Sequence, residues 1–169
     1  TWRIHNVGAP QLDEIVQDEK INKFKLQKIF DLDFNEKILL VLQHPVLVEN
    51  DRASKQMQTT LQAIKEMGYP AIVIYPNVDA GNERIISIIE DYGQSKNILV
   101  ERNMNRSVFI SLLYHVSIII GNSSCGILEA PSMKLPAINI GNRQRGRMQA
   151  CNVINCDYSK DEIKGSIQK

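Results

Sequence analysis

Residues 117–141 read SIIIGNSSCGILEAPSMKLPAINIG, two apolar β-branched runs separated by a polar stretch that contains Gly121 and Gly126. The runs at 116–121 and 136–140 predict strands, and residues 124–133 between them predict a short helix. A strand, a helix and a second strand in so short a segment form a βαβ unit with parallel strands. This stretch therefore favours an α/β fold built on a parallel sheet.

The same alternation extends over most of the chain. Apolar runs predict further strands at 37–43, 71–75, 97–101 and 152–156, and periodic segments predict helices at 51–67, 83–92, 107–115 and from Ser159 to the end. The strands are almost continuously apolar, which indicates a sheet covered by helices on both faces. We expect a Rossmann-like α/β fold over residues 1–169, as a single domain.

Residues 1–36 are less regular than the rest. The segment 13–32 predicts one amphipathic helix, which packs either on the sheet or on a neighbouring domain. Its expected apolar positions are Ile15, Ile21, Phe24, Leu26 and Ile29.

Composition excludes several classes of protein. The 169 residues are 43% hydrophobic and 23% charged, with a formal net charge of +1, which is ordinary for a globular domain and gives no reason to expect nucleic acid or a membrane as partner. No apolar run approaches the roughly 18 residues of a membrane span, and the start TWRIHNVGAP lacks the regions of a signal peptide. We expect a cytoplasmic protein.

The cysteines give no sign of a metal or disulfide site. Cys125, Cys151 and Cys156 are odd in number and scattered, and no second pair of Cys or His residues lies near them at zinc-ligand spacing. We expect reduced thiols that are buried or half-buried, and no metal.

Polar residues follow each predicted strand, where open parallel sheets bind their ligands. His44 follows the first strand, Asn77 and Asp79 follow the second, and Arg102 and Asn103 follow the third. The next two strands are followed by GNSSCG at 121–126 and GNRQRGR at 141–147. These groups are predicted to meet at one edge of the sheet, although loops are polar in most proteins without any site.

The GNSSCG stretch favours an anion site at the start of the following helix. Unpaired N–H groups at a helix start, glycines such as Gly126 and the hydroxyls of Ser123 and Ser124 suit a phosphate or diphosphate. Glu129, further along, suits the two hydroxyls of a ribose. The alternative is a serine cap and a solvated glutamate, and the residue types alone leave both open.

The remaining polar groups carry similar alternatives. Arg143, Arg145 and Arg147 lie between glycines and suit phosphate, but could equally form an exposed basic loop. His44, held extended by the proline after it, suits phosphate binding or proton transfer, but could be structural. Neither a Walker motif nor a G-x-G-x-x-G fingerprint is present.

Residues 121–147, GNSSCGILEAPSMKLPAINIGNRQRGR, closely resemble the nucleotide-binding stretch of the UDP-N-acetylglucosamine 2-epimerases. VGAPQLDEI at 7–15, QHPV at 43–46 and YPNVDAG at 75–81 fit the same family in the same order. The resemblance runs from Val7 to Arg147. SSCGILEAP departs from the SGG.QEE pattern typical of the non-hydrolysing branch, so the hydrolysing branch is favoured.

The resemblance implies a GT-B fold, with this chain as the C-terminal, UDP-binding half and an N-terminal domain absent from it. In that family Ser123 and Ser124 would contact the diphosphate, Glu129 the ribose, and Arg143 would lie near the phosphates. Asn77 and Asp79 would line the cleft, and His44 would belong to the active site. The segment from Arg102 to Ser107 would lie beside the uracil.

The implied activity is hydrolysis of UDP-N-acetylglucosamine to N-acetylmannosamine and UDP, as in sialic acid biosynthesis, by elimination of UDP and addition of water. The scheme requires no metal or organic cofactor, and the family's catalytic carboxylates lie mainly in the N-terminal domain. Family members commonly form homo-oligomers. Alternatives are a non-hydrolysing epimerase, the donor domain of another GT-B glycosyltransferase and a non-catalytic, flavodoxin-like module.

Overall fold

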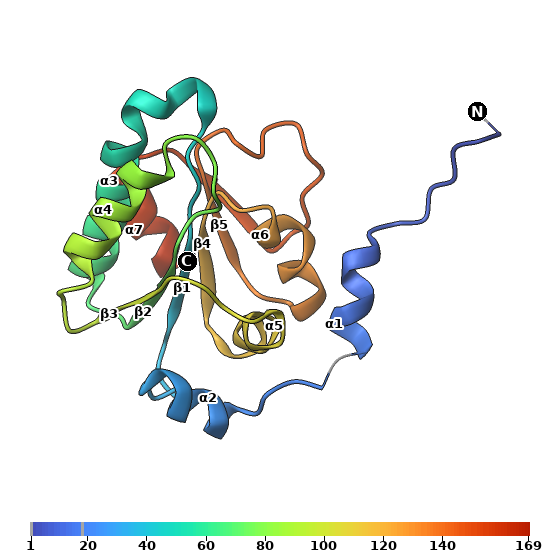
Figure 1. The fold of residues 1–169 in the computed structure, drawn as a ribbon, viewed down its shortest axis with the longest axis horizontal. Coiled ribbons are helices and arrows are strands. Elements are labelled where there is room, and N and C mark those ends of the chain that lie inside the picture. Colours follow the sequence, from blue (N-terminus) through green and yellow to red (C-terminus); the bar gives the residue numbers. More distant parts are fainter. Residues whose placement is uncertain (1, 18) are drawn as a thin grey trace.

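The structure is a computed structural model that describes residues 2–17 and 19–169 (Figure 1). Its centre is a six-stranded, wholly parallel sheet with the strand order β3-β2-β1-β4-β5-β6. The strands are β1 (Leu39–Leu42), β2 (Ala71–Ile74), β3 (Ile98–Glu101), β4 (Ile118–Gly121), β5 (Ala137–Ile140) and β6 (Val153–Cys156). The predicted α/β, Rossmann-like fold is confirmed.

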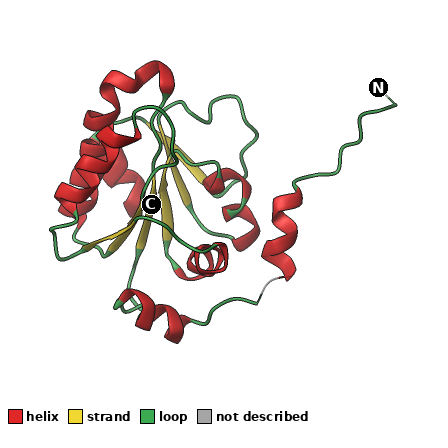
Figure 2. Cartoon of the chain, in the orientation of Figure 1, coloured by secondary structure: helices red, strands yellow, loops and turns green. Residues whose placement is uncertain are grey.

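Helices cover both faces of this sheet (Figure 2). One face packs on α3 (Ala53–Met67), α4 (Asn82–Tyr92) and α7 (Lys160–Gln168), and the other on α2 (Lys23–Phe30), α5 (Arg106–His115) and α6 (Cys125–Leu128). Successive residues of a strand pack into the hydrophobic cores on opposite faces of the sheet. Leu39 and Val41 belong to the core under α3, α4 and α7, and Leu40 belongs to the core under α2, α5 and α6. Alternation of side chains along a strand explains why both faces of each strand are apolar.

The ends of the long helices follow the sequence signals. Gly68 ends α3 in the left-handed conformation, with φ of 74°, as glycines do after helices. Ser159 caps α7 by accepting a hydrogen bond from the Glu162 N–H, and the Glu162 carboxylate accepts one from the Asp157 N–H. The two bonds form a capping box whose second bond is displaced by two residues, from Ser159 to Asp157.

The N-terminal segment differs from the single predicted helix. A short 3-10 turn (η1, Pro10–Leu12) leads into α1 (Asp13–Gln17), and α2 begins anew because Asn22 caps it by accepting from the Lys25 N–H. Leu26 is buried as expected, but Phe24 and Ile29 are exposed. The new start resets the helical face, so α2 packs on the sheet through Leu26 and Phe30.

The helix predicted over 124–133 is also shorter than expected. It consists of the single turn α6 and a separate 3-10 turn, η3 (Ala130–Met133), with Pro131 near the start of η3. Proline has no N–H to continue an α-helix. Glu129 therefore lies at the junction of two short turns instead of well inside a helix, and the dipole of so short a helix is small.

The order in which strands are added to the sheet changes side between β1 and β4, while every strand stays parallel. From β1 the chain adds β2 and β3 on one side, and then crosses to place β4 on the other side of β1. The loops after β1 and β4 therefore separate and leave a crevice at the carboxyl edge, the usual position of ligand sites in such sheets. The 3-10 segment η2 (Leu47–Arg52) follows β1 at this edge.

Gly121 permits the close approach of β4 to β1 at this crevice. Its φ is +137°, and a Cβ atom there would lie 2.1 Å from the Leu42 carbonyl oxygen. No other residue fits without displacing the β1 backbone.

No helix among the described residues is long and apolar enough to cross a bilayer.

We predict that Gly121→Ala destabilises the chain by about 3 kcal/mol or more, because it combines backbone strain with a clash against main-chain atoms. Gly165→Ala is the matched control, because Gly165 lies inside α7 with nothing within 4 Å of the added methyl. It should stabilise the chain by about 0.5–1 kcal/mol. Urea unfolding followed by circular dichroism measures both, and equal stability of the two variants would contradict the assigned role of Gly121.

Candidate functional site

Three loops meet at the carboxyl edge beside the β1–β4 crevice. They contribute His44 after β1, residues 122–124 after β4 and Arg143 after β5. The structure therefore brings together side chains that lie about 80 and 20 residues apart in sequence, as the hydrogen-bonded pairs His44–Asn122 and Asn122–Arg143 show.

His44 is 4% exposed and is held from two directions. Its backbone N–H donates to Asn122 Oδ1 at 2.7 Å, and its ring Nδ1 accepts from the Asn77 N–H at 3.2 Å. The pKa of His44 is lowered to about 4, chiefly by burial and then by the charge of Arg143, while Asp79 opposes the shift. At neutral pH the imidazole is therefore uncharged, and its proton lies on Nε2 because Nδ1 is an acceptor.

Asn122 was not singled out from the sequence, yet it is the most connected polar residue of the site. It is wholly buried, and its carbonyl oxygen accepts from Arg143 Nη1 at 3.2 Å and from Gln144 Nε2 at 2.7 Å. An asparagine after a strand is unremarkable in sequence, so only the tertiary pairing reveals it. Gln144, 1% exposed, was missed for the same reason.

The three arginines of the β5 loop separate into two groups. Arg143 is half-buried and bonded to the β4 loop, whereas Arg145 and Arg147 are exposed and line another cavity, on the β6 side, with Asp157. The sequence left two alternatives for this loop, a phosphate site or an exposed basic loop. Arg143 lies at the crevice, where a phosphate site is expected, whereas Arg145 and Arg147 form an exposed basic surface.

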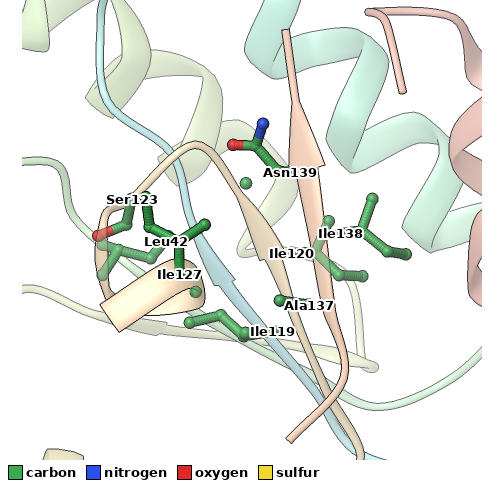
Figure 3. A pocket seen from close by; sticks show the side chains of 10 residues that line it. Leu42, Ile119, Ile120, Ser123, Ile127, Ala137, Ile138 and Asn139 are labelled. Atoms are coloured by element: carbon green, nitrogen blue, oxygen red, sulfur yellow. The ribbon is translucent and has the colours of Figure 1, made fainter. Parts of the chain in front are cut away.

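Ser123 and Ser124 precede α6 at the crevice and are both half-buried. Ser123 Oγ lies 3.5 Å from the Cys125 N–H. Beneath them is a cavity of ≈ 10 Å³, room for about one water, lined mainly by apolar residues of β4, β5 and α6 (Figure 3). A ligand of these serines must therefore lie above α6, at the edge of the sheet.

Gly126 faces the sheet in this structure. Its missing side chain would lie 3.4 Å from the Ala137 Cβ, and its N–H points back to the Ser123 carbonyl at 3.3 Å. The glycine therefore lets α6 pack closely on β5, a use separate from the phosphate contact that the sequence suggested.

Glu129 is 8% exposed and its two carboxylate oxygens differ. Oε1 lies 3.7 Å from Arg106 Nη1, whereas Oε2 is buried without a hydrogen-bond partner among the described residues. A buried carboxylate oxygen without a donor is costly. Arg106, at the start of α5, falls in the 102–107 segment that the resemblance placed beside the uracil, but its approach to Glu129 was not predicted, because the sequence does not indicate that this helix start meets α6.

An open cavity of ≈ 480 Å³ lies between the ends of β2 and β3 and the start of α5. Asn77, Arg102, Met104 and Phe109 are among its lining residues. Its volume lies within the range of small-molecule sites. Arg102 is also paired with Glu90 at 3.0 Å.

A second cavity of ≈ 440 Å³ lies between the loops after β1, β2 and β5. Pro45, Asp79 and Arg143 are among the residues around it, so Asp79 lies on the side of His44 and Arg143. Ser107, by contrast, is exposed in the first turn of α5, where its carbonyl accepts from Ser111 Oγ. It lines neither of these two cavities.

The thiols differ in exposure. Cys125 is buried and its pKa is raised to about 12, chiefly by burial, so it is unreactive at neutral pH. Cys156 is half-buried, and Cys151 is exposed, contrary to the expectation that all three would be at least half-buried. Within the described residues, no group of three or more His, Cys, Asp or Glu side chains is arranged to hold a metal ion.

Comparison with known proteins shows the family of the chain. The family model described as UDP-N-acetylglucosamine 2-epimerase matches residues 1–169. The chain is 35% identical over 160 residues to a UDP-N,N'-diacetylbacillosamine 2-epimerase (hydrolyzing) of Legionella pneumophila, covering 95% of this chain and 42% of that protein. It is 31% identical to a UDP-N-acetylglucosamine 2-epimerase of Neisseria meningitidis serogroup B, covering 98% of this chain and 44% of that protein.

The fold also matches solved structures. An S. aureus MnaA structure with UDP superposes with a TM-score of 0.69 at 15% sequence identity, over 93% of this chain and 41% of that one. At this identity the likeness establishes the fold, one half of a GT-B-like arrangement. The chain spans less than half the length of the curated relatives that it matches.

The buried imidazole predicts a pH dependence of stability. Because the folded-state pKa of His44 is lowered to about 4, the unfolded chain binds a proton from about pH 6.5 downward while the folded chain does not. The contribution of the neutral imidazole is complete above pH 6.5. It is lost as the pH falls toward 4, by about 2–3 kcal/mol.

The test compares the native chain with His44→Asn, which keeps an acceptor for the Asn77 N–H. The free energies of unfolding, measured in urea from pH 7.5 to 4.5, should converge on acidification by about 2 kcal/mol. His115, whose pKa is also lowered by burial, is present in both proteins and cancels. A difference that stays constant with pH would contradict the buried neutral state of His44.

Proposed function

Because the chain belongs to the UDP-N-acetylglucosamine 2-epimerase family, as its sequence indicated, we propose that it is the C-terminal, UDP-binding domain of a cytoplasmic, hydrolysing epimerase. The proposal assigns to the whole protein the conversion of UDP-N-acetylglucosamine to N-acetylmannosamine and UDP. The observation that carries it is Glu129, whose buried Oε2 lacks a donor. The hydroxyls of a ribose would supply that donor.

The polar groups around the crevice suit the parts of UDP. Ser123, Ser124 and Arg143 offer hydroxyls and a guanidinium to the diphosphate, in place of the dipole of a long helix. The uracil would occupy the ≈ 480 Å³ cavity that Arg102 and Asn77 help to line. The sugar would extend toward His44 and Asp79, where the second cavity opens.

The proposed reaction begins with elimination. A base removes the proton from C2 of the sugar, the C2–H electron pair forms the C1=C2 double bond, and the C1–O bond breaks with its electrons leaving on UDP. Water then adds across the double bond, with the hydroxyl bonding to C1 and a proton to C2. The new proton reaches C2 on the face opposite to the one from which the first proton was removed. The product has the inverted configuration at C2.

The chain's own residues would act on the leaving group. Negative charge develops on the diphosphate as the C1–O bond breaks, and fixed donors at that position lower the barrier. Arg143 supplies a cation, and His44 supplies an Nε2–H donor that stays neutral. We assign the base that removes the C2 proton to the part of the protein beyond this chain, because the chain covers less than half the length of its relatives.

The choice of the hydrolysing reaction has two supports. The segment SSCGILEAP, at 123–131, departs from the pattern of the non-hydrolysing branch. The relative at 35% identity also carries "hydrolyzing" in its name. Assembly of the whole protein into a homo-oligomer is part of the proposal.

The ribose assignment predicts coupling between Glu129 and the 2'-hydroxyl. Replacing UDP by 2'-deoxy-UDP should weaken binding to the native chain by about 10-fold, the value of one hydrogen bond to a charged group. Against Glu129→Gln the same replacement should cost about 3-fold or less, since the charge is gone. Calorimetry measures the four affinities, and equal losses in both proteins would sink the ribose assignment.

The reaction is tested with the full-length protein in D₂O. UDP-N-acetylglucosamine and UDP-N,N'-diacetylbacillosamine are supplied in turn, and the products are followed by NMR. The proposal expects free UDP and the C2-inverted sugar carrying deuterium at C2. UDP-linked product would indicate the non-hydrolysing reaction, and sugar without deuterium would indicate a transferase or a simple hydrolase. The 169-residue chain alone should bind UDP without turnover.

A further inference from the structure

The side chain of Asn122 takes over the pairing of β4 with β1 where the strands stop. The parallel register ends at the pair Leu42 and Gly121. One residue later the carboxamide of Asn122 contacts the main chain of His44 on both sides. Oδ1 accepts from the His44 N–H at 2.7 Å, and Nδ2 donates to the His44 carbonyl at 2.8 Å. The amide therefore imitates one further peptide of the ladder.

The main chain of Asn122 holds the other half of the site. Its carbonyl accepts from Arg143 and from Gln144, so the loops after β1 and β5 are both attached to this residue. Asn122 is 0% exposed and Gln144 is 1% exposed. These hydrogen bonds are thus shielded from water, and a hydrogen bond in the protein interior is stronger than one exposed to water.

From this geometry we propose that Asn122 is a positioning residue that fixes His44 as an Nε2–H donor and keeps Arg143 beside it. Asn122 fixes the backbone of His44, and the Asn77 N–H fixes Nδ1 as an acceptor. Nε2 is then the ring atom left to donate to a ligand. The catalytic consequence rests on the proposed function, but the effect on the His44 ring does not.

The electrostatic surroundings agree with this arrangement. Arg143 lowers the pKa of His44 and Asp79 raises it, and the lowering effects of burial and Arg143 dominate. The Tyr158 hydroxyl, which lies 3.4 Å from Asn122 Nδ2, has its own pKa raised to about 12 and is uncharged at neutral pH. Beside a neutral imidazole, the half-buried Arg143 keeps its charge available for an anion.

Asparagine suits this position because it carries a donor and an acceptor. Aspartate keeps the acceptor for the His44 N–H but turns a negative charge toward the His44 carbonyl, and that charge favours the imidazolium. Alanine leaves two buried backbone groups unpaired. Asn122→Asp is therefore the informative substitution.

The experiment follows ¹⁵N-histidine resonances of the 169-residue chain, which report the tautomer and the pKa without any ligand. The native chain should show His44 protonated at Nε2 at pH 7. Asn122→Asp should raise the pKa of His44 by one unit or more. UDP affinity should fall by at least about 10-fold at pH 7, and it should change more steeply with pH than in the native chain.

Asn139→Asp is the matched control. Asn139 is a buried asparagine on β5 that donates to Asn155 and has no bond to His44. It should lower stability while leaving the His44 tautomer and pKa unchanged. If Asn139→Asp shifts His44 as much as Asn122→Asp does, the effect is general loosening and the proposal is overturned.

Two measurements on the native chain keep the proposal testable if Asn122→Asp does not fold. The Asn122 side-chain amide protons should exchange slowly with water, and the His44 ring should carry its proton on Nε2. Fast exchange or an Nδ1-protonated ring overturns the inference. Failure of the native chain to bind UDP, with both NMR results as expected, refutes the proposed function and leaves the positioning role intact.

Discussion

The contact between the ends of β1 and β4 constrains the whole site. The two strands are neighbours in the sheet but distant in the chain, and their carboxyl ends approach so closely that only glycine fits at position 121. This approach brings Asn122 within hydrogen-bond distance of His44. The same residue then anchors Arg143 from the loop after β5. The chemistry of the crevice depends on backbone geometry set one residue earlier.

The polar residues at this edge of the sheet fall into a buried, hydrogen-bonded set and an exposed set. Asn122, Gln144 and His44 are buried and bonded to one another or to main chain, whereas Asp79 and Asn77 lie in exposed loop segments. Preorganised donors reduce the reorganisation needed when charge develops on a leaving group. The buried amides therefore serve to hold the two groups, His44 and Arg143, that would act on an anion.

The sequence predicted the sheet well and the short turns poorly. Apolar runs are strong signals because strands buried on both faces tolerate few polar residues, so all six strands were found within a few residues. Asn22 and Pro131 are weaker signals, and each breaks a helix that periodicity alone would continue. Loop order placed His44, Ser123 and Arg143 at one edge. It could not show Asn122, Gln144 and Arg106, whose partners lie on other elements.

The state of Glu129 shows why residue types alone left its role open. A glutamate after a serine-rich turn is ordinarily solvated, and in that case both oxygens would be hydrated. Here the side chain is buried, Arg106 Nη1 lies 3.7 Å from Oε1, and Oε2 lacks a donor among the described residues. A protein that used this carboxylate for stability alone would gain from pairing both oxygens, since an unpaired one costs about 1–3 kcal/mol. The unpaired oxygen is what the proposed ribose contact requires, since a ligand hydroxyl would supply the missing donor.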